Sequence, residues 1–244
     1  MKTLVRITIL ISIYLTLLFT TTSCVFNGVI GIKGNRNVVS EERSIRSNFE
    51  IINVQQEINL YITQGKPTAI SVEADDNILD LLITEVKNNE LNIYFEKNVY
   101  QSKARNVYLT TNTISKIKTS SGASVKSENT LQVKSLDLDS SSGSSIKIYV
   151  NAEEVTSQSS SGADIDIYGK TQTFSANASS GSSIDADKLE TVDAYAKASS
   201  GANIDVNVSG KFTANASSGG DIDFEGNPTN VDKNTSSGGS VSGS

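Results

Sequence analysis

The residues that could perform covalent chemistry are serines placed three positions before lysines. Ser115-Lys116-Ile117-Lys118 and Ser144-Ser145-Ile146-Lys147 both match Ser-x-x-Lys, the pattern of penicillin-recognising enzymes, in which the serine is the nucleophile. That chemistry also needs Ser-Asp-Asn and Lys-Thr-Gly partners and a helix that carries the serine. The chain contains neither partner motif. Both tetrads also fall in segments that we expect to be strands, so we predict that they are ordinary solvated strand residues.

Carboxylates in the second half of the chain suggest a different chemistry. A pair of them could act as the acid and base of a carbohydrate-active β-helix enzyme, such as a polysaccharide lyase or hydrolase. The candidates recur with the chain's internal repeat instead of forming one irregular cluster, so we keep this enzyme as the alternative and predict no catalytic residue. They are Asp164, Asp166, Asp185, Asp205, Asp221 and Asp223.

Four of these aspartates would share one column of a stacked repeat. Asp166, Asp185, Asp205 and Asp223 would then stand about 5 Å apart and repel each other, and a bound cation would relieve that repulsion. The run from Gly219 to Phe224 partly resembles the calcium-binding nonapeptide repeat, but it lacks the full Gly-Gly-x-Gly-x-Asp pattern. We therefore predict weak calcium binding or none, and we assign no metal ligand and no cofactor.

Composition excludes several classes of protein. The chain has no His and only one Cys, so a His-based triad, a Cys/His zinc site and an internal disulfide framework are all ruled out. The formal net charge is −6, and removal of Lys2 and Arg6 with a leader peptide would make it more negative. A nucleic acid is therefore not an expected partner.

The N-terminus has the features of a bacterial lipoprotein leader. Lys2 and Arg6 precede an apolar run from Ile7 to Phe19, which is too short to span a membrane comfortably. The sequence Thr21-Thr22-Ser23-Cys24 follows, and it resembles a lipobox. We predict that residues 1–23 are a signal peptide and that Cys24 carries the lipid, which would anchor the protein in the bacterial outer membrane, facing the periplasm or the cell surface. A plain signal peptide followed by an incidental cysteine is the alternative.

The second half of the chain consists of a short repeat. The tripeptide Ser-Ser-Gly occurs seven times, and Ile or Val stands three residues after each glycine. Successive glycines are 21, 19, 19, 20, 18 and 19 residues apart, and a nearly fixed period of this length predicts a repeat architecture. The glycines are Gly122, Gly143, Gly162, Gly181, Gly201, Gly219 and Gly238.

Alignment on the glycines predicts strands with one buried face. Apolar and polar positions alternate after each glycine, and a second apolar column lies seven residues before the later glycines. We therefore predict an all-β fold, a right-handed parallel β-helix-like solenoid with coils of about 19 residues. The Ser-Ser pairs would form hydroxyl ladders along one edge, beside a tight corner where glycine adopts φ > 0. An antiparallel sandwich and a disordered tail are the alternatives.

The region before the repeats shows stronger but less regular strand signals. Strands are expected at 49–54, 58–62, 70–74, 91–95 and 107–110, and residues 76–86 have the apolar spacing of a short helix with Asp75 or Asp76 as its N-cap. We interpret the region as irregular β structure that is continuous with the solenoid and caps its end. Its aromatic residues are expected to pack in the core or cap, with a contact surface for a partner as the alternative. These are Phe49, Tyr61, Tyr94, Phe95, Tyr100 and Tyr108.

Several runs in this region carry a resemblance to a known family. They are Asn35 to Arg43, Phe49 to Ile52, Ile58 to Gly65 and Val72 to Leu79. Together they resemble the head GIN domain family of auto-transporter adhesins, whose members are mostly Bacteroidetes proteins, and the later Ser-Gly repeats are similar to the family's second half. Two departures are Glu57, where the family often has Gly, and Ser-Ser-Gly-Ala/Ser, where many members have Gly-Ser-Gly-Asp/Asn. The resemblance implies a β-helix-like fold, export and an adhesive or structural role.

The resulting prediction is a lipid-anchored, exported β-solenoid that serves as an adhesin or as a binding or structural protein of the cell envelope, and that is not an enzyme. Its expected partners are the membrane, through the lipid, and a glycan or protein ligand. The expected organisation is a signal peptide (1–23), a lipidated tether with the first strand (24–48), an irregular β region (49–115) and the Ser-Ser-Gly solenoid (116–244).

Overall fold

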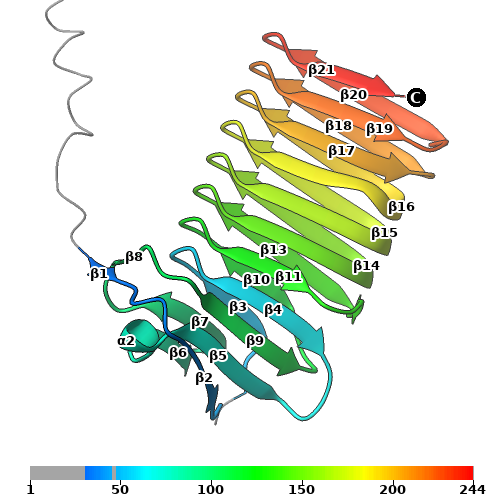
Figure 1. Cartoon of the computed structure of the whole chain (residues 1–244). Helices are drawn as coiled ribbons and strands as arrows, with labels where there is room; N and C mark the ends of the chain where they lie inside the picture. Colours follow the sequence, from blue (N-terminus) through cyan, green and yellow to red (C-terminus); the bar gives the residue numbers. More distant parts are fainter. Residues whose placement is uncertain (1–30, 46–47, 244) are drawn as a thin grey trace, which may run out of the picture. The chain divides into compact units, whose positions relative to one another are not determined.

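The computed structural model describes residues 31–45 and 48–243, so the expected leader and Cys24 lie outside the described residues. From Ile32 onward the chain forms one unit. Its architecture is a β-solenoid of about 7 turns with coils of about 19 residues, which confirms the predicted fold class. Figure 1 shows the coils stacked in sequence order from the green to the red end of the chain.

Each coil of the repeat consists of two strands joined by a Ser-Ser-Gly turn. Strands that lead into the turns form one layer, here named the entry sheet, and strands that leave them form the other, the exit sheet. The entry sheet contains β10 (Lys116–Thr119), β13 (Ser135–Ser141), the second parts of β14 (Ser145–Ser160), β15 (Asp164–Ser179) and β16 (Ser183–Ser199), then β18 (Lys211–Ser217) and β20 (Asn230–Ser236). The exit sheet contains β11 (Ser124–Ser127), the first parts of β14, β15 and β16, then β17 (Asn203–Val208), β19 (Asp221–Glu225) and β21 (Ser240–Gly243), while β12 (Leu131–Gln132) also pairs with β14.

The apolar columns expected from the sequence stack in register between the two sheets. In the entry sheet the column seven residues before each glycine pairs coil by coil, and its members are buried except for half-exposed Val231 at the end. It contains Leu136, Val155, Phe174, Ala194, Phe212 and Val231. The Ile/Val column of the exit sheet is buried as well, up to Ile222. Alternation with period two has therefore created one narrow core along the whole stack.

The Ser-Ser-Gly turns differ from the expected hydroxyl ladder. The second serine and the glycine of every turn both have positive φ, for example +55° at Ser161 and +69° at Gly162. Two successive left-handed residues are the signature of a type I′-like turn. The second serine of each turn is exposed, whereas the first is half-buried in every turn but the last. A ladder forms in the backbone: the Gly162 N–H donates to the Ser180 carbonyl of the next coil at 3.2 Å, and the turns from Gly122 to Gly219 repeat this bond.

The first coils do not follow the order of the sequence. β3 (Ile51–Val54) and β4 (Asn59–Gln64) form a coil that pairs in parallel with β10 and β11. β7 (Glu90–Phe95) and β9 (Arg105–Thr111), although later in the chain, form the next coil outward. Antiparallel strands β5 (Ala69–Asp75), β6 (Leu82–Lys87) and β2 (Val38–Arg43) complete this end, together with the short parallel pair β1 (Ile32–Lys33) and β8 (Val99–Tyr100). We name residues 32–111 the cap.

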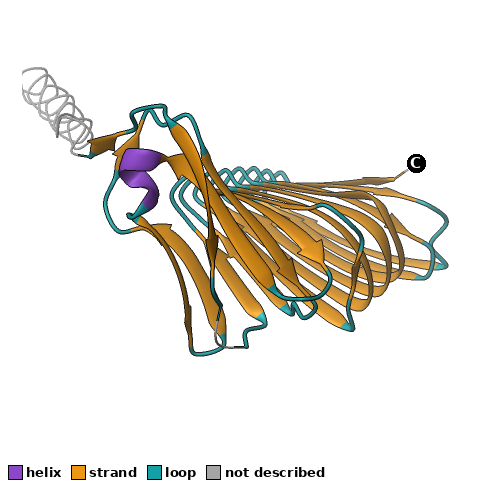
Figure 2. Cartoon of the chain, turned by 60° about the horizontal axis from the view of Figure 1, so that its bottom comes forward, coloured by secondary structure: helices purple, strands orange, loops and turns teal. Residues whose placement is uncertain are grey.

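The expected helix over 76–86 is only partly correct. Helix α2 spans Asp76–Leu79 and lies at the cap end of the stack (Figure 2). Residues 82–87 form β6 instead, where Leu82, Thr84 and Val86 pair with residues of β7. Apolar residues at 82 and 86 fit both a helical and an alternating pattern, and pairing with a neighbouring strand decides between them.

Asp75 does not cap this helix with its side chain. Its fully buried carboxylate instead accepts hydrogen bonds from the backbone N–H groups of Arg36, Lys103 and Ala104, at 2.7, 3.0 and 3.2 Å. One buried charge thus joins two loops of the cap, and N–H donors satisfy it without a cationic partner in the described residues.

In the last coil, β20 carries a charged residue in a column that is inward in the earlier coils. Lys233 pairs with Ala214 and therefore continues an inward column of alanines. Its ammonium group lies 4.6 Å from the centroid of the Phe224 ring and 3.4 Å from the Val241 carbonyl oxygen. Lys233 is thus an exposed residue that makes a cation-π contact with Phe224 at this end of the stack.

Candidate binding surface

The outer face of the exit sheet carries one column of side chains whose character changes along the stack. The column occupies the fourth position after each glycine and extends in register into the cap. We name it the tyrosine–aspartate column, and between a serine at each end it contains aromatic residues, then basic ones, then acidic ones. From the cap it reads Ser71, Tyr108, Tyr61, Lys126, Lys147, Asp166, Asp185, Asp205, Asp223 and Ser242.

The acidic part of this column confirms the predicted alignment of Asp166, Asp185, Asp205 and Asp223. Burial raises the pKa of the Asp205 carboxyl above its ordinary value, and the negative charges of Asp185 and Asp223 raise it further. Burial also raises the pKa of Asp185. Carboxylates in successive coils therefore repel one another, as the stacking argument requires.

A surface hollow of about 450 Å³ lies beside these aspartates, and Asp185, Asp187, Asp205, Asp223 and Glu225 contribute to its lining. In the part of the chain that the structure describes, no group of three or more His, Cys, Asp or Glu residues is placed to hold a metal ion. The other two acidic candidates, Asp164 and Asp221, belong to the neighbouring outward column, where Ser and Asn residues separate them. Calcium binding at the aspartates stays a question for experiment.

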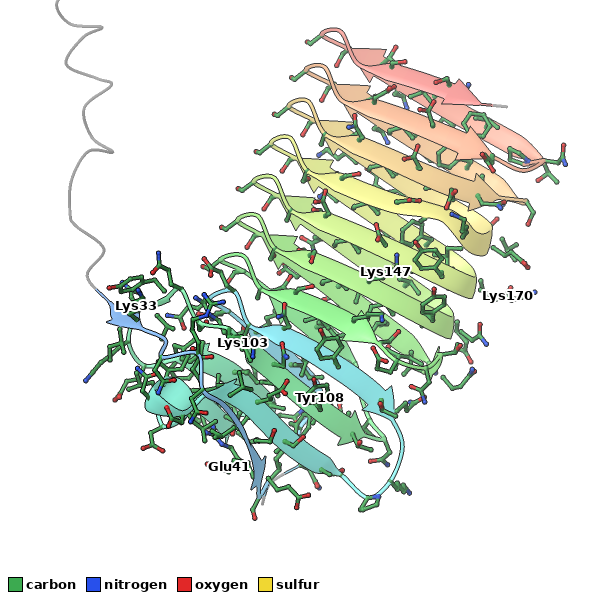
Figure 3. The ribbon with its side chains drawn as sticks, viewed as in Figure 1. Lys33, Glu41, Lys103, Tyr108, Lys147 and Lys170 are labelled. Carbon is green, nitrogen blue, oxygen red and sulfur yellow. The ribbon has the colours of Figure 1, made fainter. Side chains whose placement is uncertain are left out.

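The basic part of the column joins the acidic and aromatic parts. Lys147 Nζ lies 3.4 Å from Asp166 Oδ2, 3.1 Å from the Tyr168 hydroxyl and 4.9 Å from the centroid of the Tyr168 ring. The hydrogen bond with Tyr168 is the main cause that raises the pKa of Lys147. Lys147 therefore stays protonated, and it is held over an aromatic ring on the sheet surface. Figure 3 shows the Lys147 side chain on this part of the ribbon.

Tyrosines form two stacked pairs on the same outer face. The ring centroids of Tyr61 and Tyr108 are 5.1 Å apart, and those of Tyr149 and Tyr168 are 4.9 Å apart. One ring of each pair remains open to solvent, since Tyr108 is 44% and Tyr149 41% exposed. The second pair occupies the outward column next to the tyrosine–aspartate column, two residues farther along the strands.

The aromatic residues of the first half thus separate into two groups. Phe49 and Phe95 are buried, which confirms their expected core packing. Tyr108 packs on Tyr61 within the cap, but its strand position faces outward and leaves its ring partly exposed. A third exposed tyrosine, Tyr195, lies on the entry sheet beside a pocket of about 300 Å³ whose lining includes Asp193 and Lys211.

The Ser-x-x-Lys tetrads do not assemble a nucleophile. Ser144 is buried, and its hydroxyl is bonded to Thr119, Ser140 and the Ser141 carbonyl, whereas Lys147 points outward from the opposite face of the strand. In the other tetrad, Ser115 Oγ donates to the Glu50 carbonyl while Lys118 pairs with Glu90 at 3.0 Å. Alternation along a strand separates residues three positions apart, so neither lysine can activate its serine.

The predicted lipid-attachment residue, Cys24, lies outside the described residues. Within the part that is described, no helix is long and apolar enough to cross a membrane.

Comparison with known proteins gives a consistent result for family and fold. The family model described as "Putative auto-transporter adhesin, head GIN domain" matches residues 48–228. No curated protein matches the chain.

Three solved structures have a similar fold. A "putative adhesin" from Bacteroides fragilis NCTC 9343 superposes with a TM-score of 0.81 at 22% identity, over 88% of this chain and 100% of that one. A "putative adhesin" from Parabacteroides distasonis ATCC 8503 gives 0.75 at 18% identity, over 87% and 99%. A "putative lipid binding protein" from the same organism gives 0.72 at 19% identity, over 87% and 99%. At these identities the likeness concerns the fold.

Proposed function

The chain belongs to the head GIN domain family, and we propose that it is a lipid-anchored adhesin or binding protein of the bacterial cell envelope. The single observation that carries this proposal is the outer face of the exit sheet. There a rigid parallel stack presents exposed tyrosines, a lysine and a row of aspartates in one register. Side chains held on a regular scaffold lose little freedom on binding, so such a face suits the recognition of a large ligand.

The proposal includes attachment to the outer membrane through Cys24. The apolar leader and the cysteine that follows it support this step. The lipid would be a firm anchor, because two or three acyl chains hold a protein to a membrane far more firmly than one. The solenoid would then present its lateral faces to the periplasm or to the medium. Both locations are compatible with an envelope adhesin.

Metabolic labelling tests the anchor. Wild-type cells grown with radioactive palmitate are expected to yield a labelled protein, whereas Cys24→Ser should be exported without label. A labelled Cys24→Ser protein would contradict the lipid assignment, and it would leave the binding function untouched.

Ligand binding is tested with residues 25–244 on arrays of glycans, matrix proteins and lipid vesicles. The vesicles are included because one structural relative carries a lipid-binding description. We expect saturable binding to a glycan or protein, lost after mild unfolding. Absence of binding to every class, together with unchanged adherence of cells that lack the protein, would overturn the adhesin proposal.

A carbohydrate-active enzyme is the second candidate, and the raised pKa values of Asp185 and Asp205 favour it, because a general acid needs such a pKa. Both residues line the acidic hollow. Turnover of polysaccharides that Asp205→Asn abolishes would establish this enzyme. Binding without turnover would support the adhesin.

A further inference from the structure

We propose that Tyr108, Glu73 and Asn106 form a sugar-binding subsite on the outer face of the exit sheet, and that Tyr149 forms a second platform for the same glycan chain. The inference rests on the proposed binding function and narrows its ligand to a chain of neutral hexoses. It also places the ligand at the aromatic end of the tyrosine–aspartate column, away from the acidic hollow.

The Tyr108 ring has one covered and one open face. Tyr61 stacks against it from β4, with an interplanar angle of 16°. On the other side the same column continues with Ser71 of β5, whose side chain is too small to cover an aromatic ring. This explains why Tyr108 stays 44% exposed although it is packed. An aromatic face that is held rigid and left open is suited to the apolar C–H face of a pyranose. Figure 3 shows the Tyr108 side chain on the cap.

Polar groups that match sugar hydroxyls surround this ring. Glu73 Oε2 accepts hydrogen bonds from Asn106 Nδ2 at 2.8 Å and from the Tyr108 hydroxyl at 3.3 Å. Asn106 Oδ1 in turn accepts from Asn59 Nδ2 at 3.1 Å. A carboxylate has about four lone-pair sites and an amide oxygen two, so acceptors remain for ligand hydroxyls. The network orients these acceptors before any ligand arrives, which reduces the entropic cost of binding.

The second platform lies on the same face. Tyr149 is 41% exposed and stacks on Tyr168, whose ring centroid also lies 4.9 Å from Lys147 Nζ of the same strand as Tyr149. Its strand β14 is three coil steps from β9, through β4 and β11, which corresponds to roughly 14 Å along the stack. One coil step is close to the length of one sugar unit in an extended chain. Tyr149 lies two residues farther along its strand than the column of Tyr108, so a glycan that crosses the coils obliquely can reach both rings.

Between the platforms, β11 supplies mixed polar groups. Lys126 and Glu128 form an ion pair at 3.3 Å and are both about half exposed. A pair of opposite charges offers donors and acceptors to hydroxyls without a net charge that would select an anionic polymer. The strip from Tyr108 to Tyr149 thus favours a neutral ligand.

The test uses purified residues 25–244 and hexasaccharides of glucose, galactose, mannose and N-acetylglucosamine, with a heparin hexasaccharide and fibronectin as acidic and protein probes. Binding is measured by calorimetry and by tyrosine fluorescence, which is interpretable because the chain has no Trp. Variants are Tyr108→Ala, Tyr108→Phe and Glu73→Gln. Tyr195→Ala is the matched control, since Tyr195 is 42% exposed but lies on the entry sheet.

We expect at least one neutral hexasaccharide to bind and Tyr108→Ala to weaken it about tenfold, the equivalent of about 1.4 kcal/mol of lost stacking. Tyr108→Phe should keep most of the affinity, Glu73→Gln should reduce it severalfold, and Tyr195→Ala should leave it unchanged. Unaltered thermal melting excludes misfolding as the cause.

Failure of the subsite is distinguishable from failure of the function. Binding of fibronectin or heparin that Tyr108→Ala does not affect would overturn the subsite and leave the adhesin standing. Absence of binding to all hexasaccharides would also overturn the subsite. If Tyr195→Ala were as damaging as Tyr108→Ala, the proposed location would be wrong.

Discussion

The cap and the repeats fill the core between their strands with side chains of different size. One inward column of the entry sheet runs through both regions, and neighbouring members pair in register. It is aliphatic in the cap and the first repeats and small afterwards. Its members are Leu91, Ile52, Ile117, Leu138, Ser157, Ala176, Ala196, Ala214 and Lys233.

This decrease in side-chain size along the column shows how repetition contributes to stability. In the cap, chain reversals and antiparallel strands interrupt the regular stacking of coils, so large side chains and single contacts such as the Asp75 carboxylate join the pieces. In the repeats, every coil offers its neighbour the same turn and the same backbone bonds. Stability then accumulates from nearest-neighbour contacts, and alanine is large enough for the core.

The largest expected effect is a buried charge within the repeats. Ile184→Asp replaces a fully buried side chain, and it should cost more than about 4 kcal/mol because the narrow core holds no partner for the carboxylate. The measurement is urea unfolding followed by circular dichroism. The control is Ser183→Asn, one residue away in an outward column that already contains Asn203. An unchanged midpoint for Ile184→Asp would show that this column is not inward.

A reciprocal pair of substitutions in the shared column tests the size gradient directly. Leu91→Ala in the cap should destabilise by about 2–5 kcal/mol through the cavity it leaves. Ala196→Leu in the repeats should destabilise by about 1–3 kcal/mol through overpacking. Both residues are fully buried. If Ala196→Leu raised the melting temperature, the two sheets would be separated more widely in the repeats than the gradient implies.

The cap's dependence on single contacts is the next point to test. Asp75→Ala leaves three backbone N–H groups without their acceptor and should cost about 2–3 kcal/mol, less than the sum of individual penalties because water can enter. Hydrogen exchange should show the loss in the cap and not in the repeats. Asp76→Ala, which removes exposed bonds to Asn35 and Asn37, is the control and should have little effect.

A smaller effect is expected at one turn of the repeat. Gly162→Ala places a Cβ where nothing lies within 4 Å, so only the backbone at φ +69° resists it, and the cost should be about 1 kcal/mol. Ser161, already at φ +55°, shows that the stack tolerates such residues. Thermal melting measures the change, and a loss several times larger would mean that the turn is crowded in solution.

The smallest expected effect concerns pH. A carboxyl whose pKa is higher in the folded state than its ordinary 3.8 binds protons more strongly when folded, so its unfavourable contribution disappears as the pH falls. As the pH falls from 7 toward the ordinary carboxyl value of 3.8, the melting temperature should rise, and added salt at pH 7 should produce part of the same gain.

Asp205→Asn should reduce this pH response, because it removes one member of the repelling row. Hydrogen bonds lower the pKa values of Asp76 and Glu85, so those groups oppose the trend only below their ordinary values of 3.8 and 4.5. Equal melting temperatures in calcium and in sodium at matched ionic strength would exclude an ordered calcium site at the aspartates.

The strand register of the repeat region could be predicted, because the nearly fixed period indicates which residues of neighbouring coils lie side by side. Alignment on the glycines placed Asp166 beside Asp185 and Leu136 beside Val155, since every coil repeats the one before it. The cap has no fixed repeat period, and its coil of β7 and β9 lies outside the coil of β3 and β4. The order of strands there depends on tertiary pairing, which the local sequence does not encode.

The residues of the candidate binding surface also differ in how well the sequence predicts their neighbours. The aspartates came from the alignment, whereas stacking of Tyr61 on Tyr108 depends on the unexpected neighbourhood of β4 and β9. Tyr149 and Tyr168 could have been found, because both stand six residues after a repeat glycine and are one period apart. The sequence did not predict the positive φ of the second serine in each turn, because serine is not a typical left-handed residue.

The lysine at the end of the alanine column limits how these molecules can associate. A strand edge with free N–H and C=O groups is a template on which another chain can add. Here a second copy that extended the stack beyond β20 would have to seal the Lys233 ammonium group inside a continuous core, at a cost of several kcal/mol. This end of the stack is therefore a poor template for end-to-end growth by a second copy.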